Sequence, residues 1–476
     1  MAYSVALAAS WLIFFLVVLY YINSDKASVY HPLSFFLIYH FILFVLRPTI
    51  VYEFDYTLIY RVYQFTPSLS DKLTVLGATN LSLLVFTFAV LKFGNAPYSK
   101  VKQLPILAKD KDNYRSPLVL TWAIIGPFAI LSLFYTLSWS TSDTFDMVFD
   151  REAGTYINTS GNGYFSDAQI MLIPLVVATV WIGRFNWKYL VLAFSYIAVQ
   201  SFTGTRWQII VTAFSIALLY LYDRRIRWVK AYMIAPLLGL WLAFGLLSID
   251  RGMYFRQLAG LETSRSINVD RKPQNLRFLE SMDYGNLEFF ELIVYAVPQR
   301  TQSYDYFAEH LQVFTEPIPR VLWANKPRGA PVKFFRLDDY VPVFSFTKSV
   351  GGAGWFALGW IGVVIWSAAF GAAYGLAYSK WTRSKTVFAT LAYVVFLSLA
   401  MQLFRDGLLV SIAKMGGFAL IPLLLMRFLK NFFRLGLNQD QVRFESAGIG
   451  RGSGAVALPA AVRRRRAALA APPQQT

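Results

Sequence analysis

The stretch "YSVALAASWLIFFLVVLYY", Tyr3–Tyr21, decides the fold class of this chain. It contains no Asp, Glu, Lys or Arg, and an apolar run of about 17 to 25 residues is long enough to cross a bilayer as a helix. The whole 476-residue chain is 56% hydrophobic and only 15% charged, far from the averages of soluble domains. The sequence therefore predicts an all-α, polytopic membrane protein.

Further apolar runs bring the prediction to about eleven spans. They cover residues 33–46, 73–91, 118–137, 168–182, 190–202, 207–222, 231–247, 355–378, 387–404 and 418–433. The predicted domains are spans one to eight at 1–247, a long loop at 248–354, spans nine to eleven at 355–433, and a tail at 434–476. The end of this tail is rich in Ala, Gly, Arg and Pro without apolar periodicity, so we expect the tail to be disordered.

The basic short loops predict the orientation. Lys and Arg are frequent at 92–115, 223–230 and 379–385 and in "RFLKNFFR" after the last span, and short loops rich in Lys and Arg stay in the cytoplasm. The N-terminus is then outside and the C-terminus cytoplasmic. The long loop 248–354 also falls outside, with thirteen Lys and Arg against twelve Asp and Glu.

The stretch "QSFTGTRWQIIVTAF", Gln200–Phe214, places Arg206 in a short gap between two predicted spans. An arginine at the bilayer centre costs at least about 3 kcal/mol, so it is kept where it meets water, a partner or a ligand. On the predicted topology Arg206 lies at the outer membrane surface. Two interpretations stay open: a snorkelling side chain that anchors the helix, or a ligand-binding guanidinium.

Two segments of the long loop have a helical pattern. "TQSYDYFAEHLQVF", Thr301–Phe314, predicts a short amphipathic helix, because Tyr304, Phe307, Leu311 and Phe314 would share a face. "NLEFFELIVYAVP", Asn286–Pro298, is too short to cross the membrane and carries two glutamates, which predicts a helix lying in the interface. We therefore expect the loop to form a lid pressed on the membrane.

Four motifs suggest a family. "IPRVLWANKP" (Ile318–Pro327), the run "GGAGWFALGWIGVVI" that opens the next span, "TGTR" (Thr203–Arg206) and "FRDG" (Phe404–Gly407) occur around one large outer loop. In this order they resemble the O-antigen polymerase (Wzy-type) or oligosaccharide repeat-unit polymerase family, over roughly residues 203–407. Members often have an acidic residue just before the glycine-aromatic run, and this chain has none at 351–354.

The resemblance implies a glycosyltransferase of the bacterial inner membrane with a GT-C-like architecture. It would act on the periplasmic face, moving a growing glycan from undecaprenyl pyrophosphate onto an incoming lipid-linked repeat unit. The implied partners are this lipid-linked oligosaccharide, the bilayer, and a chain-length regulator and flippase, with no nucleic acid. An O-antigen ligase-type transferase and a polysaccharide flippase or transporter remain alternatives.

This chemistry would use arginines and a base. The chain has no Walker loop or cysteine and only three histidines, so we expect neither a metal nor a cofactor. A guanidinium can grip phosphate oxygens bidentately, which makes Arg206, Arg320 and Arg405 candidate pyrophosphate ligands, with Arg300 and Arg328 as further candidates. His310 or Glu309 is the candidate base for the acceptor hydroxyl, although His310 could equally be a hydrogen-bonded interfacial histidine.

Overall fold

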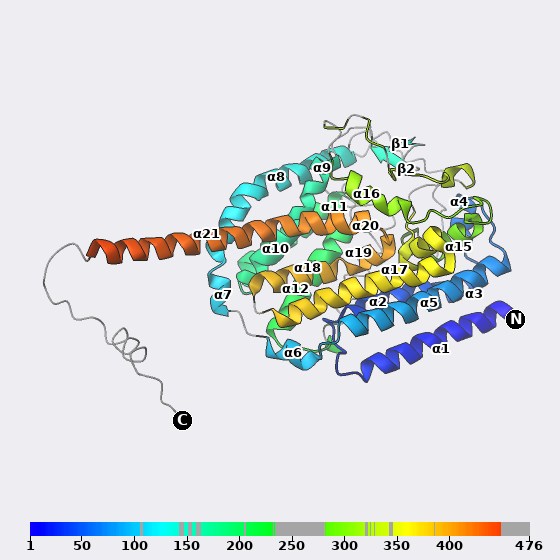
Figure 1. Ribbon diagram of the computed structural model, residues 1–476, viewed down its shortest axis with the longest axis horizontal. Coiled ribbons are helices and arrows are strands. Elements are labelled where there is room, and N and C mark those ends of the chain that lie inside the picture. Colours follow the sequence, from blue (N-terminus) through cyan, green and yellow to red (C-terminus); the bar gives the residue numbers. More distant parts are fainter. Residues whose placement is uncertain are drawn as a thin grey trace, which may run out of the picture. The chain divides into compact units, whose positions relative to one another are not determined.

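The computed structural model describes residues 1–104, 108–141, 147–150, 155–158, 163–203, 206–231, 233, 280, 282–318, 322–323, 325–327, 329–341, 346–384 and 386–448. The chain divides into two compact units, Met1–Arg427 and Phe428–Thr476. The first unit, which is mainly helical, carries the charged residues and the helix contacts discussed below (Figure 1). It includes one short antiparallel hairpin, β1 (Met147–Asp150) with β2 (Thr155–Asn158).

Within the described part of the chain, seven helical segments are long and apolar enough to cross a membrane. They are Ala2–Ile22, which is α1; Pro32–Glu53, made of α2 (Pro32–His40), the π-helix η1 (Phe41–Leu46) and α3 (Arg47–Glu53); Leu69–Phe93, which is α5; Asp110–Leu137, made of the end of α7 (Ala108–Asp112) and most of α8 (Arg115–Thr141); Gly163–Ile182, made of α9 (Gly163–Asp167), η2 (Ala168–Met171) and α10 (Leu172–Ile182); Ser349–Arg383, which is α17; and Leu409–Phe432, made of α20 (Leu409–Ser411), η7 (Ile412–Gly416) and the first part of α21 (Gly417–Gly448). An eighth results if α18 (Val387–Ser398) and α19 (Ala400–Asp406), bent by 44°, form a single span. The predicted helical membrane character is confirmed.

The other predicted spans have mixed outcomes. α11 (Trp187–Thr203) and α12 (Arg206–Asp223) are helices where two spans were predicted, although neither is among the seven found in the described residues. The predicted span 231–247 lies outside the described residues except at 231 and 233. α21 continues to Gly448, beyond position 433, so the predicted tail is helical up to that residue, and positions 449–476 lie outside the described residues.

Short elements connect the long helices. They are α4 (Leu58–Val62), α6 (Tyr98–Gln103), η4 (Met282–Tyr284), α15 (Asn286–Ala296), η5 (Ala308–Leu311), α16 (Gln312–Thr315) and η6 (Leu337–Asp339). Most of these lie between α12 and α17 in the sequence. They supply several of the charged side chains of the candidate site.

The pair α5 and α17 forms the most extensive helix contact in the described chain. Glycines permit this contact: a Cβ atom on Gly371 would lie 2.7 Å from the Phe86 carbonyl oxygen, and one on Gly375 would lie 2.9 Å from that of Val90. Gly371 and Gly375 are four residues apart, the spacing by which small residues bring membrane helices into close contact. The backbones of these two helices therefore lie in direct contact.

α17 is broken near its start. Leu358 and Gly359 have non-helical dihedral angles, and the φ of +58° at Gly359 is one that glycine adopts without steric cost. Gly354 and Gly362 touch, since a Cβ on Gly354 would lie 2.6 Å from the Gly362 carbonyl oxygen. In a straight helix two residues eight positions apart are separated by about 12 Å, so the contact between Gly354 and Gly362 requires the chain to reverse its direction at the break. The glycine-aromatic run therefore forms a tight helical hairpin rather than the simple start of a span.

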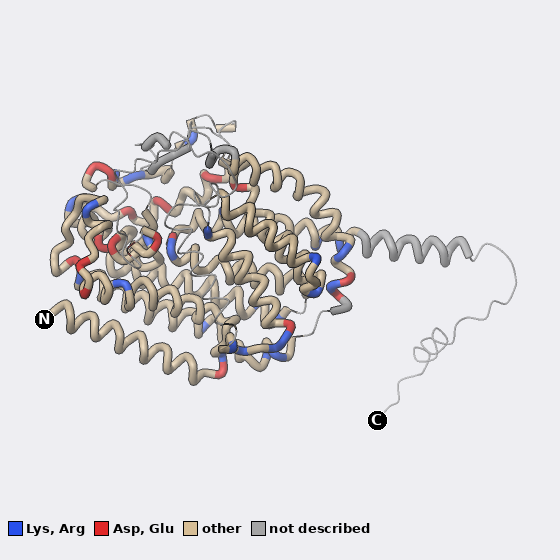
Figure 2. Tube along the Cα trace, turned by 180° about the vertical axis from the view of Figure 1, so that it is seen from behind, with Lys and Arg blue, Asp and Glu red and all other residues tan. Residues whose placement is uncertain are grey.

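The basic loops gather at one end of the bundle, here called the basic end, and it comprises the segments 23–31, 92–104, 223–230 and 379–384 (Figure 2). Val29 N–H donates to the Arg227 carbonyl, Tyr98 N–H to that of Asp25, and the Ser379 hydroxyl to that of Phe93. Three of the four basic segments predicted to share one side of the membrane, 92–115, 223–230 and 379–385, thus meet at one end of the bundle through their described residues. The side that this end faces stays a prediction.

Candidate functional site

Arg206 and Arg405, two arginines expected to bind pyrophosphate, meet at one carboxylate. Arg206 is the first residue of α12 and Arg405 lies in the last turn of α19. Arg206 Nη1 donates to Asp283 Oδ2, and Arg405 Nη2 lies 3.8 Å from Asp283 Oδ1. All three side chains are partly exposed. Residues up to 199 positions apart in the sequence thus build a single anion-binding point, which we call the arginine pair.

Close backbone packing fixes the position of Arg405. Gly407 ends α19 with a left-handed φ of 69°, and a Cβ there would clash with the Ser349 carbonyl oxygen. Asn286 Nδ2 donates to the Arg405 carbonyl at 3.0 Å. The Nε atom of Arg405 is buried and makes no hydrogen bond to any group in the described residues. Arg405 is therefore held firmly and retains a donor.

The other predicted arginines do not add to this cluster in the described structure. Arg300 is exposed and stacks on Tyr295, with its guanidinium carbon 3.3 Å from the ring centroid. Its Nη1 donates to the Tyr295 carbonyl at 3.4 Å. Arg320 and Arg328 lie outside the described residues, so their predicted role stays a prediction.

His310 is packed against an aromatic ring that connects it to the arginine pair. Its ring stacks on Trp366 at 4.0 Å between centroids and 18° between planes. Trp366 Nε1 donates to the Gly407 carbonyl at 2.7 Å, two residues after Arg405. Burial lowers the pKa of His310 to about 4, so the imidazole is neutral at pH 7 and can accept a proton. Its buried Nδ1 has no hydrogen-bond partner among the described residues.

The helix predicted at Thr301–Phe314 is wrong. Tyr306 and Phe307 have left-handed φ angles of 52° and 62°, and only the short η5 and α16 follow. The N–H groups of Asp305 and Tyr306 instead donate to the Phe356 and Ala357 carbonyls, at 3.0 and 2.9 Å. Those carbonyls end the first half of α17 and would otherwise lack partners. Tertiary hydrogen bonding thus overrides the local apolar pattern.

Glu309, the other candidate base, is already paired. Its Oε2 lies 2.5 Å from Lys348 Nζ, and its backbone N–H donates to Asp305 Oδ2 at 2.9 Å. Burial and the neighbouring Glu309 charge raise the pKa of Asp305 to about 6. Because the Glu309 carboxylate is held by Lys348 while His310 Nδ1 has no hydrogen-bond partner among the described residues, His310 is the more available proton acceptor of the two.

α15 carries two buried glutamates beside the arginine pair. Glu288 forms an ion pair with Arg47, with Arg47 Nε 3.0 Å from Glu288 Oε1, and both side chains are 1% exposed. Glu291 Oε2 accepts a hydrogen bond from the Tyr60 hydroxyl at 2.6 Å. The expectation that this segment lies in the membrane interface is wrong, because nearly every α15 residue is buried within the protein. Arg47 from α3 and Tyr60 from α4 each bind one carboxylate oxygen of these glutamates, which offsets the cost of burial, while Glu288 Oε2 has no hydrogen-bond partner among the described residues.

Glu291 predicts a pH dependence of stability. Burial raises its pKa from an ordinary 4.5 to about 8, against the opposing Tyr60 hydrogen bond and the Lys72 charge, while Glu288 and Asp71 raise it further. A carboxyl group with a raised folded-state pKa stabilises the fold below its ordinary pKa, and this stability is lost as pH rises through the folded value. We expect the melting temperature of the detergent-purified protein to fall from about pH 4.5 to pH 8, and Glu291→Gln to flatten this fall.

The matched control for this prediction is Glu53→Gln, which removes an exposed carboxylate from α3. It should leave the pH dependence of the wild-type protein intact. If the melting temperatures of the wild type and of Glu291→Gln fall by the same amount across this pH range, the expected role of Glu291 is contradicted.

Several residues of the site were not predicted from the sequence. Asp283 is one of many acidic residues in the loop, and nothing in its neighbours distinguishes it. Glu288 and Glu291 did offer a signal: two carboxylates inside the apolar run "NLEFFELIVYA" need buried partners if that run enters the core. That signal identifies the glutamates but not Arg47 or Tyr60, which lie more than 200 positions earlier.

Comparison of the chain with protein-family models, curated proteins and solved structures gave no match. The case for a function therefore depends on the geometry of the charged groups.

Proposed function

We propose that this protein is a membrane glycosyltransferase that polymerises a lipid-linked glycan. The observation that carries the proposal is the convergence of Arg206 and Arg405 on the Asp283 carboxylate. Two guanidinium groups that already hold one anion are suited to the two phosphates of a diphosphate, because each guanidinium can bind phosphate oxygens bidentately. The neutral His310, connected through Trp366, supplies a proton acceptor.

In the proposed reaction the diphosphate of the donor replaces Asp283 between the two arginines. The bond between the anomeric carbon and the diphosphate oxygen breaks, and a hydroxyl of the acceptor sugar forms the new glycosidic bond. The hydroxyl proton passes to His310, and undecaprenyl diphosphate leaves with the bonding electron pair. Fixed guanidinium groups stabilise the negative charge that develops on this leaving group.

The proposal includes a location and an architecture. We place the arginine pair on the periplasmic face of a bacterial inner membrane and the basic end in the cytoplasm, with about eleven spans in a GT-C-like arrangement. A chain-length regulator and a flippase would act beside it. The basic loops at a single end of the bundle support this orientation, since short loops rich in Lys and Arg stay in the cytoplasm.

Deletion of the gene, followed by electrophoresis of the surface glycan, tests the proposal. We expect single repeat units attached to their acceptor and loss of the ladder of longer chains, restored by the wild-type gene. An unchanged ladder would refute a polymerase. Unattached glycan that accumulates on its lipid carrier would indicate a ligase, and loss of all glycan an earlier step such as flipping.

Cysteine labelling tests the orientation. The chain has no cysteine, and Ser70 on α5 and Ser99 on α6 are both exposed. In intact spheroplasts we expect a membrane-impermeant maleimide to label Ser70→Cys and to leave Ser99→Cys unlabelled until the membrane is permeabilised. The reverse pattern would place the arginine pair on the cytoplasmic side and remove the proposed periplasmic reaction.

A further inference from the structure

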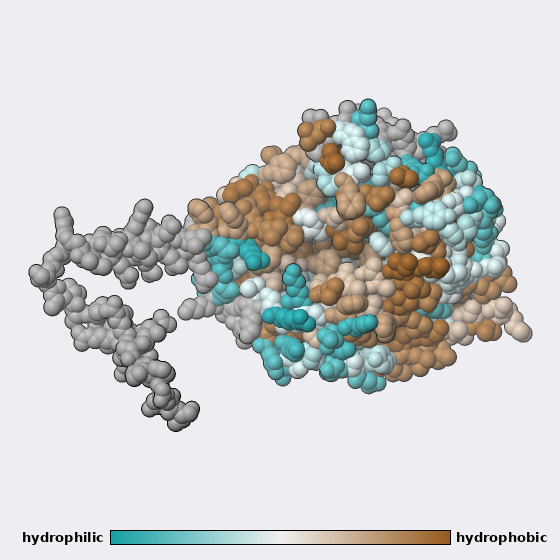
Figure 3. Space-filling view, in the orientation of Figure 1, coloured by the Kyte–Doolittle hydropathy of each residue, from teal (hydrophilic) through white to brown (hydrophobic). Residues whose placement is uncertain are grey.

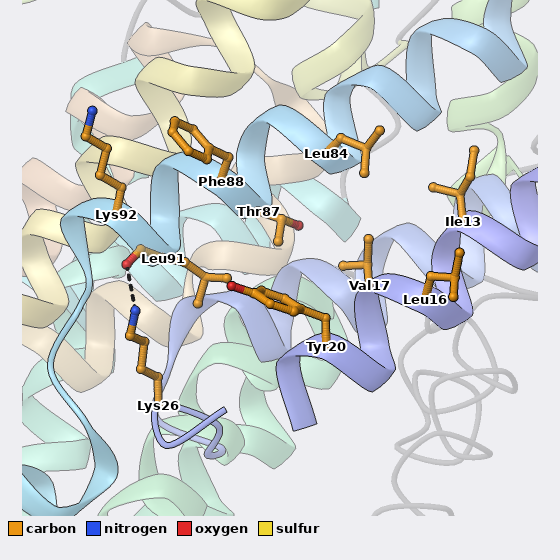
Figure 4. A pocket seen from close by; sticks show the side chains of 10 residues that line it. All are labelled: Ile13, Leu16, Val17, Tyr20, Lys26, Leu84, Thr87, Phe88, Leu91 and Lys92. Carbon is orange, nitrogen blue, oxygen red and sulfur yellow. Dashed lines mark hydrogen bonds between the residues drawn. The ribbon is translucent and has the colours of Figure 1, made fainter. Parts of the chain in front are cut away.

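An open groove runs between α1 and α5, away from the arginine pair. It has a volume of about 590 Å³, and its walls are apolar: Ile13, Leu16 and Val17 from α1 face Leu84, Phe88 and Leu91 from α5 (Figure 4). Lys26 and Lys92 also line it, and both lie at the same end of the groove, opposite Ile13 and Leu84. The groove therefore has a long apolar part and a cationic end.

The groove opens toward the surroundings of the bundle. Only 28% of the apolar window of α1 is buried within the protein, and Leu16 and Phe88 are 55% and 68% exposed. The space-filling view shows largely hydrophobic side chains over this helix (Figure 3). Because α1 is a candidate span, these exposed side chains would face lipid chains, and a groove between them would be filled by one.

The cationic end retains capacity to bind an anion. Lys26 Nζ donates one hydrogen bond, to the Leu91 carbonyl at 3.3 Å, and an ammonium group has three donors. Lys92 is exposed, with its Nζ 5.7 Å from the Phe88 ring centroid. Arg227 adds a third positive charge nearby by donating to the Ala27 carbonyl, while Asp25 is an exposed carboxylate in the same loop.

We propose that this groove binds an anionic phospholipid. One acyl chain lies between α1 and α5, and the headgroup phosphate lies at Lys26 and Lys92. Basic pockets between membrane helices on the cytoplasmic side bind anionic headgroups in this way. The groove lies at the basic end of the bundle, so the lipid belongs to the leaflet on that side. The inference depends on the span character of α1 and α5 and not on the proposed transferase activity.

Native mass spectrometry of the detergent-purified protein tests the site, with phosphatidylglycerol as the probe. We expect the wild type to retain one phosphatidylglycerol. In Lys26→Ala/Lys92→Ala the affinity for phosphatidylglycerol should fall about 25-fold, because each lysine near an anionic headgroup strengthens binding about fivefold. Lys100→Ala/Lys102→Ala is the matched control, because it removes two exposed lysines of α6 at the same end. This control should bind phosphatidylglycerol like the wild type.

Three further results decide the outcome. Leu84→Trp, which fills the apolar part of the groove, should also weaken binding although no charge changes. Equal affinity for phosphatidylcholine, or equal losses in the two double-lysine variants, would overturn the proposal in favour of unspecific attraction. Binding of glycerol phosphate as tight as that of phosphatidylglycerol would overturn the lipid assignment. If the double variant unfolds, Lys26→Gln/Lys92→Gln replaces it, with the same expected loss.

Discussion

Replacing Arg405 by lysine is expected to reduce glycan polymerisation by about 10²- to 10³-fold, the usual loss when one preorganised donor to a developing anion is removed. Lysine keeps the charge but has no planar pair of N–H donors, so it cannot bind two phosphate oxygens of one diphosphate bidentately. The same loss is expected for Arg206→Lys, because both guanidinium groups meet at Asp283. The measurement is the rate of chain extension by purified protein in liposomes that contain the lipid-linked repeat unit.

Arg300→Lys is the matched control for these variants. Arg300 belongs to the same long segment but stacks on Tyr295 at the surface, so its replacement should change the rate by less than about threefold, within the small effects of surface substitutions. The membrane level and the melting temperature of each variant must match the wild type. Wild-type rates in both Arg206→Lys and Arg405→Lys would leave these arginines with an anchoring or structural role only.

His310→Phe should reduce polymerisation by about 10²- to 10⁴-fold, the usual contribution of a positioned general base. Phenylalanine can keep the stack on Trp366 but has no ring nitrogen to take the acceptor proton. Since the pKa of His310 is lowered to about 4, the wild-type rate at low substrate concentration should rise as pH increases through about 4 and then stay level. Initial rates measured across pH give both results.

Two comparisons separate a base from a packing residue. Glu309→Gln removes the partner of Lys348 without touching the imidazole, so it should retain the rising limb near pH 4. Retained binding of lipid-linked donor by His310→Phe would show that the arginine pair is intact. A His310→Phe protein that extends chains at the wild-type rate would show that the proton acceptor is another group, and would leave His310 as part of the aromatic packing.

The helices could be predicted because each one depends on a local property. A run such as Tyr3–Tyr21 has no alternative to a helix once it enters a bilayer, since every backbone polar group must be satisfied within the segment. The basic loops were also predictable, and the structure brings them to one end. Arg206 was identified because a charge beside an apolar run needs an explanation, and Arg405 because it lies in the sequence "FRDG", one of the four motifs of the family resemblance.

The features that were not predicted depend on contacts distant in sequence. The apolar face of Thr301–Phe314 suggested a helix. The N–H groups of Asp305 and Tyr306 instead donate hydrogen bonds to two carbonyls at the break of α17. α15 looked interfacial because its two glutamates are costly to bury, and the partners that make burial possible, Arg47 and Tyr60, belong to α3 and α4. No local pattern records which distant side chain will satisfy a buried charge.

The ion pair between Arg47 and Glu288 has a consequence for how the protein is made. Its two residues are separated by 241 positions, and ribosomes add about 5 to 20 residues per second, so Arg47 waits roughly 12 to 48 s for its partner. α5 waits longer for α17, its main neighbour. The first helices therefore enter the bilayer as an incomplete assembly. A nascent chain that stalls before Asn286 lacks the Glu288 carboxylate that binds Arg47 in the finished protein, and it lacks the helix that covers α5.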